Sequence, residues 1–122
     1  MKKFSEISTR PNRAVQAWLI LVGRAMNRQT LTYSILDELM NFGNPRALGP
    51  ILDYIWAYCK INALPPLTIL VVNKNTGTPS SGMGESNPAQ QESVFEFDWY
   101  GVVPPSSEEL DVAHKGDSPT QP

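Results

Sequence analysis

Eleven prolines interrupt this chain of 122 residues, and their positions restrict its fold more than any other feature does. Proline has no backbone N–H to donate, so it is not tolerated deep inside a helix or in a central strand. The prolines stand at positions 11, 45, 50, 65, 66, 79, 88, 104, 105, 119 and 122. They leave residues 12–44 and 67–78 uninterrupted, and 12–44 is the longest stretch without a proline in the chain. A chain of this length is long enough for one domain and too short for two.

Three segments have apolar residues spaced three and four positions apart, which is the pattern of a helix with one buried face. They cover residues 12–27, 33–42 and 49–61. Thr9 or Asn12 is suited to cap the first helix. Gly43 is suited to end the second, because glycine adopts the left-handed C-cap conformation without steric cost. Pro50 fixes the start of the third helix close to its own position.

Two further segments are predicted to be extended. Leu31 and Thr32 form a short one, and residues 67–73 are a β-branched apolar run of strand length. Residues 74–91 are rich in Asn, Thr, Gly, Ser and Pro, which indicates a mobile loop. The order helix, short strand, helix, helix, strand predicts an α+β fold of the winged helix-turn-helix kind, with three helices and a short sheet.

The segment after this loop fits two secondary structures. Apolar and aromatic residues over 88–100 can share a helical face or alternate along a strand, and we favour the helix. Ser106 and Glu109 have capping-box spacing, which predicts a single helical turn. The acidic segment around and after this turn is predicted to be disordered. We therefore expect a winged-helix-like domain over 1–103 and a disordered acidic tail over 104–122.

Charge is unevenly distributed along the chain. Residues 1–74 hold nine Lys or Arg and four acids, whereas residues 75–122 hold one Lys and eight acids. The net charges are +5 and −7, which together give the −2 of the whole chain. A basic ordered part with an acidic tail is typical of nucleic-acid-binding proteins, because cationic side chains neutralise phosphates. We expect Arg24, Arg28 and Lys74 to contact phosphates.

The segment from Thr30 to Gly77 resembles part of a known family. Thr32-Tyr33 opens a helix, Arg46-Ala47-Leu48-Gly49 precedes the next, and a proline leads into a hydrophobic strand that ends with Asn73. This arrangement is similar to the winged-helix half of alkylguanine-DNA alkyltransferases and alkyltransferase-like proteins. The resemblance implies that Tyr33 and Arg46 engage double-stranded DNA, with residues early in the third helix facing the major groove.

The residues that carry alkyl transfer in that family are absent. Pro66-Leu67-Thr68-Ile69 stands where the family has Pro-Cys-His-Arg, or a Trp in place of the Cys. Cys59 is the only cysteine and has no histidine nearby in sequence to lower its pKa, so we expect a core residue. His114, the only histidine, falls in the predicted solvated tail. We therefore expect no enzymatic activity, no cofactor and no metal site.

The longest apolar run covers residues 17–22 and has six residues, whereas a membrane span needs about 20. The run also lies behind too polar a leader to be a signal peptide. We expect a soluble, cytoplasmic protein without a membrane partner.

Two functions fit these observations. The first hypothesis is a non-enzymatic module that binds double-stranded DNA through Tyr33, Arg46, Arg24, Arg28 and Lys74. The second is a protein-interaction domain, such as an inhibitor, an immunity factor or an assembly subunit, built on the same scaffold. In that case the aromatic segment 94–103 is the interaction surface or completes the core, because aromatic residues are enriched where interfaces gain most affinity. Its aromatic residues are Phe95, Phe97, Trp99 and Tyr100.

Overall fold

The computed structural model describes residues 1–73 and 88–116. Within them the fold is α+β and mostly helical. The helices are α1 (Arg10–Met26), α2 (Tyr33–Met40), α3 (Leu48–Ile61), α4 (Pro88–Glu96) and α5 (Ser107–Gly116), and the strands are β1 (Leu31–Thr32) and β2 (Val71–Val72). The 3-10 turns are η1 (Phe4–Ile7), η2 (Pro45–Ala47), η3 (Leu67–Leu70) and η4 (Trp99–Gly101). None of the helices among the described residues has the length and hydropathy that a membrane-spanning helix requires.

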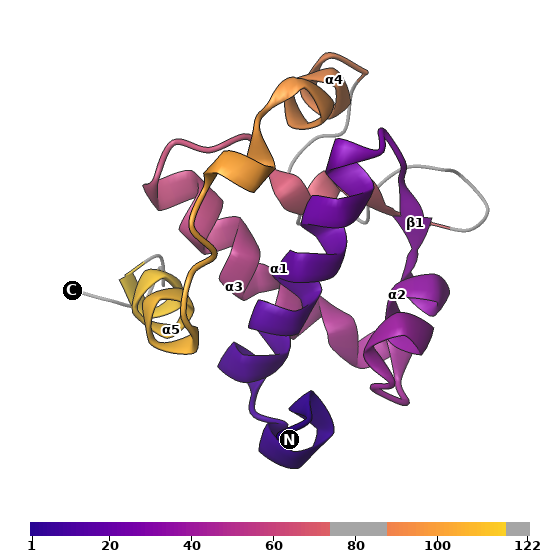
Figure 1. Cartoon of the computed structure of the whole chain (residues 1–122), viewed down its shortest axis with the longest axis vertical. Helices are drawn as coiled ribbons and strands as arrows, with labels where there is room; N and C mark the ends of the chain where they lie inside the picture. The colour runs from indigo at the N-terminus through magenta and orange to yellow at the C-terminus, as the bar shows by residue number, and fades with distance from the viewer. Residues whose placement is uncertain (74–87, 117–122) are drawn as a thin grey trace.

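Helix α1 runs through the centre of the molecule and contacts each of the other four described helices (Figure 1). It begins close to the predicted position, because the Thr9 hydroxyl accepts a hydrogen bond from the Asn12 amide at 3.4 Å. Pro11 suits the first turn, where the donor that it lacks has no partner within the helix. The buried apolar residues of α1 are Ala14, Ala17, Trp18, Leu21, Val22 and Ala25.

Arg13 on α1 is buried, with an exposed fraction of 4%. Its guanidinium donates to the Met40 carbonyl at 2.7 Å, to the Gln16 side-chain oxygen at 2.8 Å and to the Ser8 hydroxyl at 3.0 Å. It also lies 5.3 Å from the ring centroid of Phe42. Met40 is the last residue of α2, so a cation meets the negative end of that helix. Arg13 therefore fixes the end of α2 against the start of α1.

Helix α2 is capped by Thr32, whose hydroxyl accepts a hydrogen bond from the Ile35 amide at 3.2 Å. It ends at Met40, two residues earlier than predicted. Asn41 adopts the left-handed conformation there, with a φ of 51°, and takes the role expected of Gly43. Asparagine is used at this position after glycine, because its short polar side chain tolerates the left-handed region.

Strands β1 and β2 form a two-stranded parallel sheet. The strand predicted over 67–73 is confirmed only at 71–72, because residues 67–70 form the 3-10 turn η3. All side chains of η3 are buried, in contact with α1, α3 and α4. A short apolar run that is buried on every side has no periodicity that distinguishes a strand from a helix. The strand was favoured because the run is β-branched and has the length of a strand.

Helix α4 confirms the helix that was favoured over 88–100, although it ends at Glu96. Its first residues, 88–91, had been predicted to belong to a mobile loop. The rest of that predicted loop, residues 74–87, lies outside the described residues.

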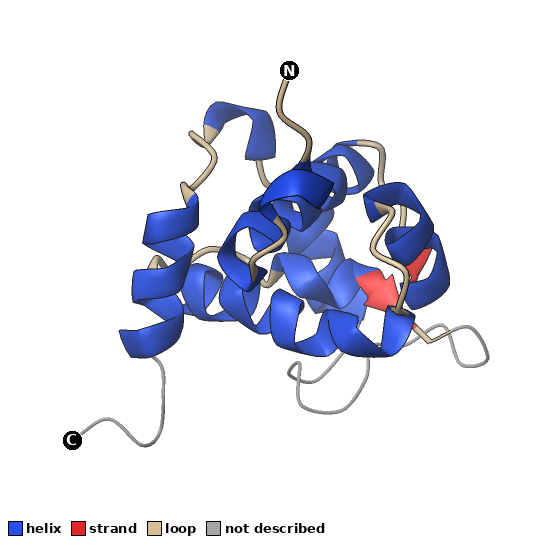
Figure 2. Cartoon of the chain, turned by 90° about the horizontal axis from the view of Figure 1, so that it is seen from below, coloured by secondary structure: helices blue, strands red, loops and turns tan. Residues whose placement is uncertain are grey.

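Helix α5 is the largest difference from the prediction. Residues 107–116 were expected in a disordered tail, yet they form a helix that packs on α3 and α1, on the side opposite the strand pair (Figures 1 and 2). The predicted capping box is present, with the Glu109 amide donating to the Ser106 hydroxyl at 3.1 Å and the Ser106 amide donating to the Glu109 carboxylate at 3.0 Å. The helix extends beyond one turn because Leu110 and Ala113 are buried against the core. Residues 117–122 lie outside the described residues.

Candidate functional site

The residues predicted to bind DNA lie at two ends of the molecule. Arg46 is exposed in η2, close to the end of α2 that Arg13 holds against the start of α1. Arg24 is half-buried in the last turn of α1, eleven residues beyond Arg13 or about 16 Å along the helix. Tyr33 is half-buried against the core. Lys74 lies outside the described residues.

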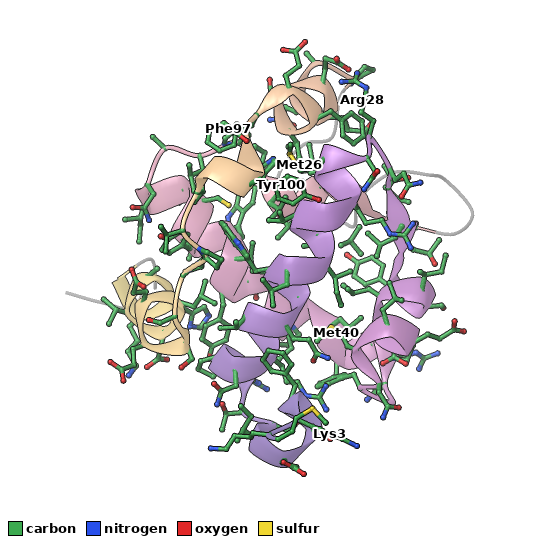
Figure 3. All side chains as sticks on the ribbon, viewed as in Figure 1. Lys3, Met26, Arg28, Met40, Phe97 and Tyr100 are labelled. Atoms are coloured by element: carbon green, nitrogen blue, oxygen red, sulfur yellow. The ribbon has the colours of Figure 1, made fainter. Side chains whose placement is uncertain are left out.

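Arg28 is exposed, and its charged group is engaged by α4 (Figure 3). Its guanidinium donates to both carboxylate oxygens of Glu92, at 2.5 and 2.6 Å, and lies 5.2 Å from the ring centroid of Phe95. The hydrogen bond raises the pKa of Arg28 and lowers the pKa of Glu92. A phosphate that binds Arg28 must displace Glu92, so this arginine is less available to nucleic acid than its sequence position predicts.

Helix α3 was expected to face a major groove, but neighbouring helices cover most of it. Seven of its fourteen residues are buried, and α1 and α5 pack along it. A helix that reads base edges needs an exposed face that carries hydrogen-bonding side chains. The exposed residues of α3 are Pro50, Asp53, Lys60 and Ile61.

The aromatic segment 94–103 completes the core with its first half. Trp99 is buried, and its indole N–H donates to the Val94 carbonyl at 2.7 Å. Its ring meets the ring of Trp18 edge to face, at a centroid distance of 5.7 Å. The half-buried aromatic residues of this segment are Phe95 and Phe97.

The second half of the segment borders a hollow of about 260 Å³ between η4 and α1, which we call the η4 hollow. Trp18 and Trp99 form its floor, while the rim includes Leu19, which is 49% exposed, and Tyr100, which is 66% exposed. Figure 3 shows Tyr100 beside α1. None of the residues that line this hollow is charged. A concave apolar site of this kind binds an apolar group.

Leu19 is the residue of this site that the sequence prediction missed. It lies in the segment 12–27, whose apolar residues were expected to form one buried helical face. Successive residues of a helix point about 100° apart, so Leu19 points away from the face that buries Trp18. The sequence signal for such a residue is an apolar stripe that is wider than the part of the helix surface that other elements cover.

Cys59 is buried in the core, as predicted. Burial raises the pKa of its thiol to about 11, so the thiol is protonated at neutral pH and is a poor nucleophile. The prediction that His114 lies in a solvated tail is wrong. It is half-buried on α5 and stacks on Tyr54 with a ring-centroid distance of 4.1 Å. Within residues 1–73 and 88–116, no group of three or more His, Cys, Asp or Glu is placed to hold a metal ion.

Comparison with models of protein families, with curated proteins and with solved structures gave no match to this chain. The similarity of residues 30–77 to the alkyltransferases therefore stays a prediction. The function has to be inferred from the residues and from their arrangement in the structure.

Proposed function

We propose that this protein is a protein-interaction module that seats an apolar side chain of a partner protein in the η4 hollow. The observation that carries the proposal is the pair of exposed side chains, Leu19 and Tyr100, above a floor of two buried indole rings. Because Trp18 and Trp99 are held in the core, the hollow is preformed and little conformational entropy is lost when it is filled. Tyrosine and tryptophan are also enriched among the residues that dominate interface affinity.

The lining defines the chemistry of the partner. Val102 and Pro104 add further apolar surface, and the hollow has no charged group to attract or orient an ionic ligand. Its volume suits one large apolar side chain, projected from the surface of a second protein. Affinity then comes from removing apolar surface of both proteins from water.

Photocrosslinking tests this proposal. The full chain is produced in cells with a photoreactive phenylalanine analogue in place of Tyr100. After irradiation of these cells, we expect one discrete cross-linked protein. The matched position is Glu38, which is exposed on α2, and it is expected to give none of that product. The captured protein is then purified and its affinity measured. Leu19→Lys is expected to weaken binding at least about tenfold, because it places a charge in an apolar site.

Two outcomes would contradict the η4 proposal. One is the same set of products from positions 100 and 38, which would mean that capture is unspecific. The other is a Leu19→Lys variant that binds the purified partner as tightly as the wild type. Glu38→Lys changes an exposed charge away from the hollow and is expected to leave the affinity unchanged.

Double-stranded DNA binding is a second candidate, favoured by the charges at the end of the molecule that holds η1 and η2. Lys2, Lys3 and Arg10 are exposed there together with Arg46, whereas Arg28 lies at the opposite end (Figures 1 and 3). None of these four side chains forms an ion pair with a described residue, so they can neutralise phosphates without displacing a carboxylate.

The winged-helix assignment belongs with this second candidate. The order of α1, β1, α2, α3 and β2 supports this assignment, which remains part of the proposal. Because α5 covers α3, we place the DNA surface at the η1–η2 end and not on α3.

Fluorescence anisotropy of labelled double-stranded DNA, titrated with protein at about 50 and 200 mM salt, tests the second candidate. We expect binding that weakens steeply between the two concentrations, and an Arg46→Gln variant that binds more weakly than Arg24→Gln. No binding at the lower salt concentration would eliminate the DNA hypothesis. Equal losses in the two variants would contradict the placement of the surface at the η1–η2 end.

A further inference from the structure

A second and larger hollow lies between the last turn of α3 and helix α5, and we call it the α3–α5 groove. Its volume is about 540 Å³. Its apolar surface comes from Tyr58 and Ile61 on α3 and from Val112 and Ala113 on α5. Two carboxylates of α5, Glu108 and Glu109, also line it. The groove therefore combines an apolar floor with an acidic border.

The apolar residues of this groove are more exposed than the packing of the two helices requires. Ile61 is 55% exposed and Val112 is 69% exposed. Helix α5 packs on the core through Leu110 and Ala113, so Val112 lies outside the face that holds the helix in place. These two side chains are available to a further element laid between α3 and α5.

The acidic border is not paired with a basic side chain of the described residues. Glu108 precedes Val112 by one helical turn and shares its face, and it forms no ion pair with a described residue. The basic side chain in the last turn of α5, Lys115, is already paired with Asp111 at 2.8 Å. Lys60 is next to Ile61 in sequence but does not line the groove. Burial, and to a lesser degree the negative charge of Glu109, raise the pKa of the Tyr58 hydroxyl.

We infer that the α3–α5 groove binds a basic amphipathic helix of a partner protein. Apolar residues three and four positions apart on that helix would contact Ile61, Val112 and the Tyr58 ring, while its lysines or arginines would face Glu108 and Glu109. This is the helix-in-groove mode of recognition, with affinity from apolar burial and orientation from complementary charge. The groove is separate from the η4 hollow, so the inference stands or fails independently of the proposed function.

The segment that follows α5 in the sequence is not a suitable occupant. Residues 117–122 read Asp-Ser-Pro-Thr-Gln-Pro, with no large apolar side chain to cover Ile61 and Val112. Its one charged residue is acidic and would be repelled by Glu108 and Glu109. A basic apolar segment of another protein matches the groove in both respects.

A model peptide tests the inference. The probe is a fluorescent peptide of about 15 residues, with leucines spaced three and four apart and lysines elsewhere, because shorter helices are only marginally stable alone. We expect saturable binding to the full chain by anisotropy, with amide NMR shifts concentrated in 58–62 and 108–116. A peptide with glutamate in place of every lysine is expected to bind at least about tenfold more weakly.

Two variants locate the binding. Val112→Lys puts a cation in the groove and is expected to weaken binding of the lysine peptide at least about tenfold. Leu39→Lys makes the same change of charge at a comparably exposed apolar residue on α2 and is expected to bind like the wild type. Glu108→Gln, a smaller change, is expected to weaken binding about two- to fivefold and to reduce its salt dependence. It provides the test if Val112→Lys fails to fold.

Four results would overturn the inference. They are no saturable binding of the lysine peptide, equal binding of the glutamate peptide, NMR shifts centred on η4, and equal losses in Val112→Lys and Leu39→Lys. Sedimentation of the free protein adds a further decisive outcome. A dimer that Val112→Lys converts to a monomer would assign the groove to a second copy of this chain and not to a basic helix.

Discussion

Replacing Trp99 with alanine is expected to lower the free energy of unfolding by about 3–5 kcal/mol, the range for truncating a buried aromatic residue. The indole is buried, packs edge to face on Trp18, and donates its N–H to the Val94 carbonyl at 2.7 Å. The alanine variant removes these contacts and leaves a cavity behind the η4 turn. Urea unfolding followed by circular dichroism measures the change, and the midpoint of thermal unfolding should fall by roughly 10–20 °C.

Two variants complete the test of Trp99. Trp99→Phe keeps an aromatic ring but leaves the Val94 carbonyl without its donor, so we expect an intermediate loss of about 1–3 kcal/mol. Tyr100→Ala changes the neighbouring exposed ring and is expected to alter stability by less than about 0.5 kcal/mol. A Trp99→Ala variant as stable as Tyr100→Ala would show that segment 94–99 does not belong to the core.

Replacing Arg13 with methionine is expected to lower the free energy of unfolding by about 2–4 kcal/mol. Methionine retains an unbranched side chain of similar length, so most of the packing along the stem is kept. The loss comes from the guanidinium, because the Met40 carbonyl keeps only the longer hydrogen bond from the Gln16 side-chain amide, at 3.2 Å, and the end of α2 loses its cation. Equilibrium urea unfolding gives the difference.

The matched control for Arg13 is Arg10→Met, one turn earlier on the same helix, where the side chain is exposed. It is expected to change stability by less than about 0.5 kcal/mol. Arg13→Lys should behave more like Arg13→Met than like the wild type, because an ammonium cannot reproduce the planar set of bonds to Ser8, Gln16 and Met40. If Arg13→Met and Arg10→Met are equally stable, the buried guanidinium does not hold α2 in place.

Sequence patterns predicted the first three helices within a few residues, because each has an amphipathic stripe and a local end signal. The Thr9 cap is a contact between residues three apart and can be recognised without the fold. The end of α2 was placed less well, since Gly43 and Asn41 both suit the left-handed conformation and local sequence does not choose between them. Propensity identifies such positions, and tertiary packing selects among them.

The start of helix α5 was recognised in the sequence, but the length of the helix was underestimated. The Ser106–Glu109 capping box predicted a helical start, yet acidic composition favoured disorder for the residues that follow. The stability of α5 comes from burial of Leu110 and Ala113 against other helices, and this tertiary contribution cannot be judged from composition. The same contacts place His114 on Tyr54.

The candidate surfaces were predicted only in part. The aromatic density of 94–103 identified the right segment, but the division between buried Trp99 and exposed Tyr100 depends on Trp18, eighty-one positions away in sequence from Trp99. The basic residues were counted correctly, but pairing of Arg28 with Glu92 joins residues separated by 64 positions. Local patterns give residue types, whereas contacts of this range decide which of them remain available.

The packing of α5 on α1 and α3 also bears on how the chain is made. A ribosome releases the N-terminal helices first, at about 5–20 residues per second, and α5 emerges only after nearly the whole described chain. Until then the side of α3 that α5 later covers is open to solvent. A ribosome that stalls before Ser107 would display this apolar surface to chaperones and proteases, so the order of synthesis delays closure of the core until α5 is released.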